Sequence, residues 1–230
     1  MKLHGFQKMT LLDFPGKVAC TVFTGGCNFR CPFCHNALLV TELDEAEIYD
    51  EDEIMDFLKK RKGLLDGVAV TGGEPLMTDE TEKFLARIKA EGFLVKLDTN
   101  GSYPERLKSI VNGGLADYVA MDIKNSRELY AETVGLPKYD ISKIEESVSF
   151  LLEGRVDCEF RTTVVRQFHT VESITEAAKW IQGAKRYFLQ NFIDSGNLIG
   201  EGMSGVSKEE MELMREAASQ YVPQTLLRGI

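Results

Sequence analysis

The chain has 230 residues, of which 43% are hydrophobic and 27% are charged, and this composition is ordinary for a folded globular protein. Its formal net charge of −9 argues against nucleic acid as a partner, because non-specific binding of nucleic acid requires a basic surface. The sequence has no apolar run long enough to cross a membrane and no signal peptide at its start, so we expect a cytoplasmic protein with no membrane partner.

Six short segments are rich in β-branched and aromatic residues, which is typical of strands. They cover residues 17–23, 67–71, 93–99, 118–123, 157–165 and 187–191. Several are almost continuously apolar, as strands of a parallel sheet are when both faces are covered. Amphipathic segments predict helices over residues 51–62, 80–91, 104–111, 142–153, 172–181 and 208–220. Ser207 and Glu210 have the spacing of a capping box at the start of the last helix.

The alternation of strands and helices predicts an α/β fold built from repeated βαβ units with right-handed crossovers. Because the chain is short, six such units favour a partial (β/α)6 barrel over a closed eight-stranded barrel. We expect a single domain over residues 1–230, with a short N-terminal extension, a core over about residues 16–192, and a C-terminal helix and tail over residues 193–230.

Three of the five cysteines follow the first predicted strand in a Cys-x3-Cys-x2-Cys spacing; they are Cys27, Cys31 and Cys34. Cysteines this close together in a cytosolic protein indicate a metal site rather than a disulfide framework. Three thiolates would leave one iron of a [4Fe–4S] cluster with an open coordination position, which is a place for substrate chemistry. The alternative is a structural zinc ion with His35 as its fourth ligand.

Other residues with reactive side chains are predicted to be structural. Cys20 and Cys158 fall inside predicted strands, and we expect both to be small buried hydrophobic side chains. His169 follows the fifth predicted strand, within reach of a site at the strand ends, but we expect it at the surface.

Polar residues and glycines stand at the ends of the later predicted strands, where α/β proteins place their active sites. They are Gly72, Gly73 and Glu74 after the second strand, Asp98, Thr99 and Asn100 at the third, Asp122 and Lys124 at the fourth, Arg161 in the fifth, and Gln190 in the sixth. Each set also has a plain structural interpretation: Gly-Gly, Glu-Pro and Asn-Gly are common turn pairs, and charged residues within strands form ion pairs with one another.

With the cysteine spacing and the Gly72-Gly73-Glu74-Pro75 element, the sequence resembles the radical S-adenosylmethionine (SAM) superfamily, whose signature is C-x3-C-x-φ-C with an aromatic φ, here Phe33. The resemblance implies a partial barrel of that type, one [4Fe–4S] cluster on the three cysteines, and S-adenosylmethionine as cofactor. It also implies that the methionine amino and carboxylate groups chelate the open iron. One electron from the reduced cluster would then release methionine and a 5′-deoxyadenosyl radical.

The resemblance further assigns roles to the residues near the cysteines and at the first strand ends. Phe33 and His35 would lie near the adenine, with Cys34 between them. Gly72 and Gly73 would let the backbone approach the ligand, and the nearby Glu74 would accept a hydrogen bond from its ammonium group.

Residues at the later strand ends would contact the rest of the ligand. Asp98, Thr99 and Asn100 would face its sulfonium and ribose side, and Asp122 and Lys124 would contact it directly. Arg161 would bind the methionine carboxylate, and Gln190 would cap the site. Asp98, Thr99 and Asp122 could together hold a monovalent cation.

The stretch from Gly5 to Lys17 resembles the activating enzymes of glycyl-radical enzymes, first those of anaerobic ribonucleoside-triphosphate reductase and then those of pyruvate formate-lyase ([formate-C-acetyltransferase]-activating enzymes). This resemblance implies a larger glycyl-radical enzyme as protein substrate and a flavodoxin or ferredoxin-type electron donor. The short chain supports it, since an open barrel mouth admits a protein loop. The alternative is a radical enzyme that acts on a small molecule, as 7-carboxy-7-deazaguanine synthase does.

Overall fold

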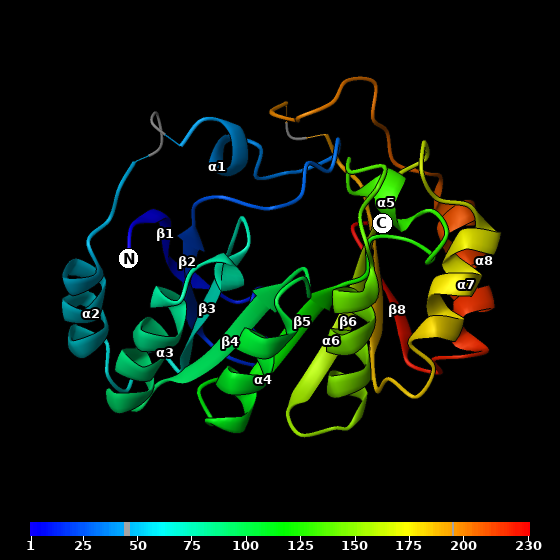
Figure 1. Cartoon of the computed structure of the whole chain (residues 1–230). Helices are drawn as coiled ribbons and strands as arrows, with labels where there is room; N and C mark the ends of the chain where they lie inside the picture. Colours follow the sequence, from blue (N-terminus) through cyan, green and yellow to red (C-terminus); the bar gives the residue numbers. More distant parts are fainter. Residues whose placement is uncertain (44–46, 195) are drawn as a thin grey trace. The chain divides into compact units, whose positions relative to one another are not determined.

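A computed structural model describes residues 1–43, 47–194 and 196–230 of the chain, and Figure 1 draws it as a cartoon. The chain divides into two compact units, each of which is built from more than one segment. Unit 1 contains Met1–Asn28, Leu38–Val119 and Arg155–Asp157, and unit 2 contains Phe29–Ala37, Ala120–Gly154 and Cys158–Ile230.

Unit 1 is built on four strands that lie side by side in chain order. They are β1 (Leu3–Thr10), β2 (Ala19–Thr24), β3 (Gly67–Gly72) and β4 (Leu94–Thr99). β1 pairs antiparallel with β2, whereas β2, β3 and β4 run parallel, with Thr21 opposite Ala69 and Ala69 opposite Lys96. The parallel strands are almost fully buried, which explains why β2 and β3 contain no charged residue, whereas β4 contains Lys96 and Asp98.

The helices of unit 1 follow the strands in βα order. They are α1 (Leu38–Thr41), α2 (Glu51–Lys60), the 3-10 helix η1 (Pro75–Met77), α3 (Glu80–Ala90) and α4 (Pro104–Asn112). Asp50 caps α2 by accepting a hydrogen bond from the backbone N–H of Asp52, and Pro104 occupies the first turn of α4, where it needs no donor. The apolar faces of α3 and α4 are buried, and in Figure 1 both helices lie along β3 and β4.

Unit 2 contains the end of β5 (Tyr118–Asp122), then β6 (Asp157–Val164), β7 (Tyr187–Asn191) and β8 (Thr225–Arg228), and β6, β7 and β8 are parallel. Its helices are α5 (Tyr130–Thr133), α6 (Ser142–Leu152), α7 (Val171–Trp180) and α8 (Lys208–Ser219). Along β6, Phe160, Thr162 and Val164 are buried while Arg161 and Thr163 are half-buried. Since side chains of a strand alternate between faces, this sheet has one packed face and one polar face.

The six predicted strands and six predicted helices are confirmed, with ends that differ by no more than two residues. The capping box of Ser207 and Glu210 is also confirmed, with Ser207 Oγ 3.2 Å from the backbone nitrogen of Glu210. The sequence analysis missed β1, whose central residues are half-buried or exposed, and β8, which has only four residues. Among the residues that the structure describes, no helix is both long and apolar enough to span a lipid bilayer.

Candidate functional site

The three clustered cysteines lie on the loop that follows β2. Cys27 belongs to unit 1, and Cys31 and Cys34 belong to unit 2. Cys27 and Cys34 are half-buried, and Cys31 is 7% exposed. In unit 2, burial raises the pKa of the Cys34 thiol, against the opposing charge of Lys124. The three thiols therefore differ in exposure, and Cys31 is the most buried of them.

In unit 1, the turn after β3 packs directly on the cysteine loop. The backbone nitrogen of Gly73 donates to the carbonyl of Thr24 at 2.9 Å, and that of Glu74 donates to the carbonyl of Gly26 at 2.8 Å. A Cβ atom on Gly73 would lie 1.8 Å from the carbonyl oxygen of Gly26, and Gly72 has a φ of +120°. Both positions therefore require glycine, because the turn packs closely against the backbone that leads to Cys27.

Glu74 connects this turn to the end of β4. Its side chain is 1% exposed, and its Oε1 accepts hydrogen bonds from the backbone nitrogen of Leu76 at 2.9 Å and from Thr99 Oγ1 at 2.8 Å. Its Oε2 accepts from the backbone nitrogen of Asn100 at 2.6 Å. A buried carboxylate must be hydrogen-bonded, and here three donors of the chain meet that requirement.

The side chain of Asn100 extends this network to the cysteine loop. Its Oδ1 accepts from the backbone nitrogen of Ser102 at 2.9 Å, and its Nδ2 donates to Asn28 Oδ1 at 3.0 Å. The same Nδ2 lies 3.8 Å from Cys27 Sγ in hydrogen-bonding geometry. Asn28 and Ser102 were missed by the sequence analysis, because neither belongs to a motif and both are recognised only by their contacts.

Lys96 is a further charged residue that the sequence analysis missed. It is 2% exposed, and its ammonium group forms an ion pair with Asp98 two residues further along β4. Residues two apart in a strand point to the same face, so the Lys-x-Asp spacing was a usable signal, like the Asp-x-Lys spacing of Asp122 and Lys124. The pair neutralises the charge on Asp98 at the end of β4.

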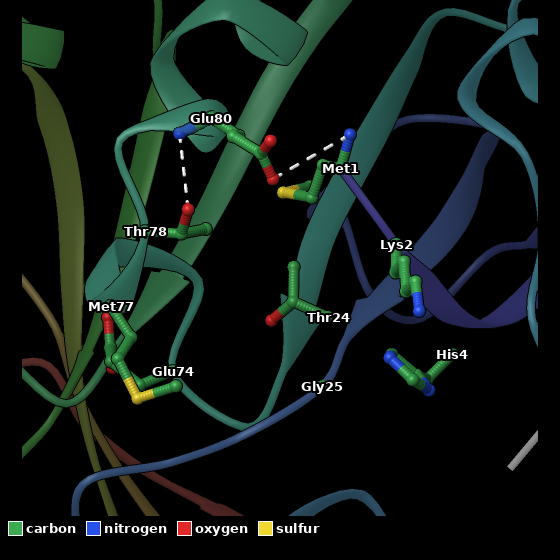
Figure 2. A pocket seen from close by; sticks show the side chains of 9 residues that line it. All are labelled: Met1, Lys2, His4, Thr24, Gly25, Glu74, Met77, Thr78 and Glu80. Atoms are coloured by element: carbon green, nitrogen blue, oxygen red, sulfur yellow. Dashed lines mark hydrogen bonds and ion pairs between the residues drawn. The ribbon is translucent and has the colours of Figure 1, made fainter. Parts of the chain in front are cut away.

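A pocket of about 510 Å³ opens in unit 1 next to the cysteine loop, and Figure 2 shows the side chains around it. Its lining residues are Met1, Lys2, His4, Thr24, Gly25, Glu74, Met77, Thr78 and Glu80. The Met77 side chain packs on Gly26, where an added Cβ would meet it at 2.5 Å. Glu74 thus lies between this pocket and the Asn100 network.

In unit 2, Asp122 at the end of β5 lies between two cationic side chains, Lys124 just after that strand and Arg161 within β6. Its Oδ1 accepts from Arg161 Nε and its Oδ2 from Lys124 Nζ, both at 3.0 Å. Burial alone would raise the pKa of Asp122, but the charges of Arg161 and then Lys124 outweigh it and lower the pKa to about 2. Two cationic side chains are thus fixed on either side of one carboxylate.

His169 was expected at the surface, but it is buried in unit 2 with 3% exposure, and that prediction is wrong. Its Nδ1 accepts a hydrogen bond from the backbone nitrogen of Val165 at 3.0 Å, so its Nε2 donates to the carbonyl of Lys124 at 2.8 Å. The ring also contacts Phe33, which packs against Phe168 with ring centroids 5.6 Å apart. Burial lowers the pKa of His169, which keeps the ring neutral.

His35 is exposed at one edge, but its ring is fixed. It stacks on Phe192 with centroids 5.1 Å apart and an interplanar angle of 12°, and its Nε2 lies 3.0 Å from the carbonyl oxygen of Ile193. Partial burial lowers the pKa of His35. Gln190 is half-buried on β7, opposite Thr163 on one side and Arg228 on the other.

The other two cysteines are buried in strands, as predicted. Cys20 lies in β2, where burial raises the pKa of its thiol to about 12, and Cys158 lies in β6. In the described parts of the chain, no three His, Cys, Asp or Glu side chains are arranged to hold a metal ion. The assignment of cluster ligands therefore rests on the Cys-x3-Cys-x2-Cys spacing.

Comparison with known families identifies the class of protein. The family profile of the Radical SAM superfamily matches residues 21–181, which include the cysteine loop and the ends of β3 to β6. The chain therefore belongs to the radical SAM superfamily.

Among individual relatives, a Methanocaldococcus jannaschii protein named as a glycyl-radical enzyme activating enzyme is 30% identical over 99% of this chain and 96% of its own length. A Listeria monocytogenes pyruvate formate-lyase-activating enzyme is 31% identical over 54% of the chain and 53% of its own length. A Helicobacter pylori GTP 3′,8-cyclase is 34% identical over 58% of the chain and 44% of its own length. The chain thus spans about half the length of the latter two proteins.

Solved structures share the fold. Streptococcus suis SuiB bound to its precursor peptide SuiA has a TM-score of 0.72, with 13% identity over 91% of this chain and 48% of that one. A domain of a Bacteroides vulgatus pyruvate-formate lyase-activating enzyme has a TM-score of 0.57, with 16% identity over 71% of this chain and 99% of that one. The predicted α/β fold of the radical SAM type is confirmed.

His169 predicts a pH dependence of stability. Its pKa is lower in the folded chain than the usual value of about 6.5, so the unfolded chain binds the proton more readily. The stability that His169 contributes is therefore complete above about pH 6.5 and is lost as the pH falls, by at most about 1.4 kcal/mol per pH unit. The difference in unfolding free energy between wild type and His169→Gln should shrink between pH 7.5 and pH 5, as measured by urea denaturation.

The matched control is Phe168→Leu, which changes the neighbouring side chain but removes no titrating group. Its difference from wild type should be the same at every pH. A His169→Gln difference that also stays constant over this range would contradict the neutral, buried histidine.

Proposed function

We propose that the chain is an activating enzyme that creates a glycyl radical on a separate, larger enzyme. The observation that carries the proposal is the similarity to the Methanocaldococcus jannaschii protein, which extends over 99% of this chain and 96% of that one. Such end-to-end similarity includes every strand end that could meet a ligand, whereas the match to the GTP cyclase covers 58% of the chain.

In this proposal Cys27, Cys31 and Cys34 are the ligands of a single [4Fe–4S] cluster. Cys20 and Cys158 are excluded because both are buried within strands. A Cys3His zinc site remains the rival, but His35 is stacked on Phe192 and its Nε2 faces a backbone carbonyl. That position of the ring leaves His35 Nε2 hydrogen-bonded to the protein rather than turned to a metal.

We propose contacts with S-adenosylmethionine for each unit by itself. In unit 2 the proposed contacts are Phe33, His35, Asp122, Lys124, Arg161 and Gln190, and in unit 1 they are Gly72, Gly73, Glu74, Asp98, Thr99 and Asn100. The two cationic side chains beside Asp122 support a carboxylate-bearing ligand. Direct ligand contact by Glu74 stays a prediction, since three donors of the chain already meet its carboxylate.

The proposal includes no monovalent cation. Lys96 already neutralises Asp98, and Lys124 and Arg161 already neutralise Asp122. Protein cations therefore stand at both carboxylates that a bound ion would use, and a further positive charge would be repelled.

When bound, the reduced cluster would supply the electron that cleaves S-adenosylmethionine to methionine and a 5′-deoxyadenosyl radical, which takes a hydrogen atom from the substrate. A glycine Cα is a suitable donor because its radical is stabilised by the flanking amides and no side chain blocks planarity. The protein substrate we propose is anaerobic ribonucleoside-triphosphate reductase, with pyruvate formate-lyase as the next candidate. We propose a flavodoxin or ferredoxin-type protein as electron donor.

A radical enzyme for a small substrate is the second candidate function. It is favoured by the 34% identity to the GTP 3′,8-cyclase over 142 residues. This identity is higher than the 30% to the Methanocaldococcus jannaschii protein, but that protein matches over 239 residues. Both candidates need the cluster and S-adenosylmethionine, so only the identity of the hydrogen donor separates them.

The ligand assignment predicts the metal content of cysteine variants. After anaerobic reconstitution, the wild-type protein should hold about four irons and four sulfides, and Cys27→Ala, Cys31→Ala and Cys34→Ala should each lose the intact cluster. Cys20→Ala is the matched control: it should keep the cluster and lose only stability, because its thiol is buried in β2. Zinc as the sole stoichiometric metal, or cluster loss in a folded Cys20→Ala variant, would contradict the assignment.

The function predicts a radical on the partner. Reduced protein, S-adenosylmethionine and a candidate glycyl-radical enzyme should give an EPR doublet of a glycyl radical in the absence of oxygen. The signal should be absent with Cys31→Ala and with a partner whose radical glycine is replaced by alanine. Conversion of GTP or another small molecule, without a radical on any candidate partner, would favour the second candidate instead.

A further inference from the structure

The amide of Asn100 has only one orientation that satisfies its surroundings. The backbone nitrogen of Ser102 can only donate, so the Asn100 atom 2.9 Å from it must be the oxygen Oδ1. The amide nitrogen Nδ2 is thereby turned towards the cysteine loop, where its two hydrogens meet Asn28 Oδ1 at 3.0 Å and Cys27 Sγ at 3.8 Å. Asn100 is 5% exposed, so water cannot easily replace these partners.

A purely structural role would account for only part of this geometry. The contact between Ser102 and Asn100 Oδ1 is an Asx turn, which closes the chain after β4 and needs no particular direction of Nδ2. The contacts of Nδ2 with Asn28 and Cys27 connect this turn to the cysteine loop, although the residues are more than 70 positions apart in sequence. The two contacts of Asn100 Nδ2 therefore orient the cysteine loop and are not needed for the turn.

We propose that Asn100 is a positioning residue that donates an N–H···S hydrogen bond to Cys27 and raises the reduction potential of the cluster. The inference rests on the proposed function, in which Cys27 is a cluster ligand. A reduced cluster carries one more negative charge than an oxidised one, and part of that charge lies on the ligand sulfurs. A donor aimed at a sulfur therefore stabilises the reduced state more than the oxidised state.

Glu74 keeps this donor in place. Its Oε2 accepts from the Asn100 backbone nitrogen at 2.6 Å, and its Oε1 accepts from Thr99 Oγ1 at 2.8 Å. Both ends of residue Asn100, its backbone and its amide, are thus held by groups of unit 1. A donor that is fixed in advance costs no reorganisation when the cluster gains its electron.

The test compares reduction potentials of reconstituted proteins by EPR-monitored titration without S-adenosylmethionine, so that ligand binding does not contribute. Asn100→Leu has a similar volume but lacks the donor, and Asn100→Asp keeps the shape but replaces the donor with an acceptor. At a fixed solution potential, the ratio of reduced to oxidised cluster should fall about tenfold in Asn100→Leu, which is a shift of about 59 mV to more negative potential. The shift in Asn100→Asp should be at least as large.

Asn112→Leu is the matched control, because Asn112 is exposed at the end of α4 and the same substitution there removes an amide far along the chain from the loop. It should leave the potential unchanged. Iron content is measured on every sample, so absence of a cluster in wild type would refute the proposed function, not only this inference. An unchanged potential in iron-replete Asn100 variants would overturn the inference. Both variants could also lose the cluster while their apoproteins melt at the same temperature as the wild-type apoprotein. That result would overturn the inference too, because it would show that Asn100 keeps Cys27 in place and does not tune the potential.

Discussion

The buried carboxylate of Glu74 is the interaction on which the candidate site in unit 1 depends. It lies at the turn after β3 and accepts a hydrogen bond from the backbone nitrogen of Asn100, the first residue after β4. An unpaired buried carboxylate would be very costly, so the turn and the β4 end must adopt the one arrangement that brings three donors to it. The same arrangement presses Gly73 against Gly26 and turns the Asn100 amide to Cys27.

Unit 2 also holds a carboxylate by hydrogen bonds, but there the donors are cationic. Asp122 is held between Lys124 and Arg161, and His169 fixes the backbone of Lys124 through its carbonyl. The cationic groups are thereby fixed by the fold, which would lower the entropic cost of binding an anion there. In each unit the polar groups at the strand ends are oriented by contacts inside that unit. Such preorganisation is what an enzyme needs when it must position a large cofactor and a reactive radical.

The sequence predicted the strands and helices well, because continuous apolar runs and amphipathic periods are local signals. The cysteine spacing and the Gly-Gly-Glu-Pro element are also local, and they led to the family that the comparisons confirm. The buried position of His169 could not be predicted in this way, since it depends on the carbonyl of Lys124 more than 40 positions away. Asn28 and Ser102 were missed for the same reason: their roles come from partners and not from patterns. Lys96 was missed although its spacing from Asp98 is a local signal.

The most direct test of the proposed function follows the hydrogen atom. A glycyl-radical enzyme labelled with deuterium at the Cα of its radical glycine is mixed with the reduced protein and S-adenosylmethionine without oxygen. Mass spectrometry of the 5′-deoxyadenosine should then show one deuterium per activated partner. Unlabelled 5′-deoxyadenosine formed together with the partner's radical, or deuterium transferred only from a labelled small molecule, would contradict hydrogen abstraction from a partner's glycine.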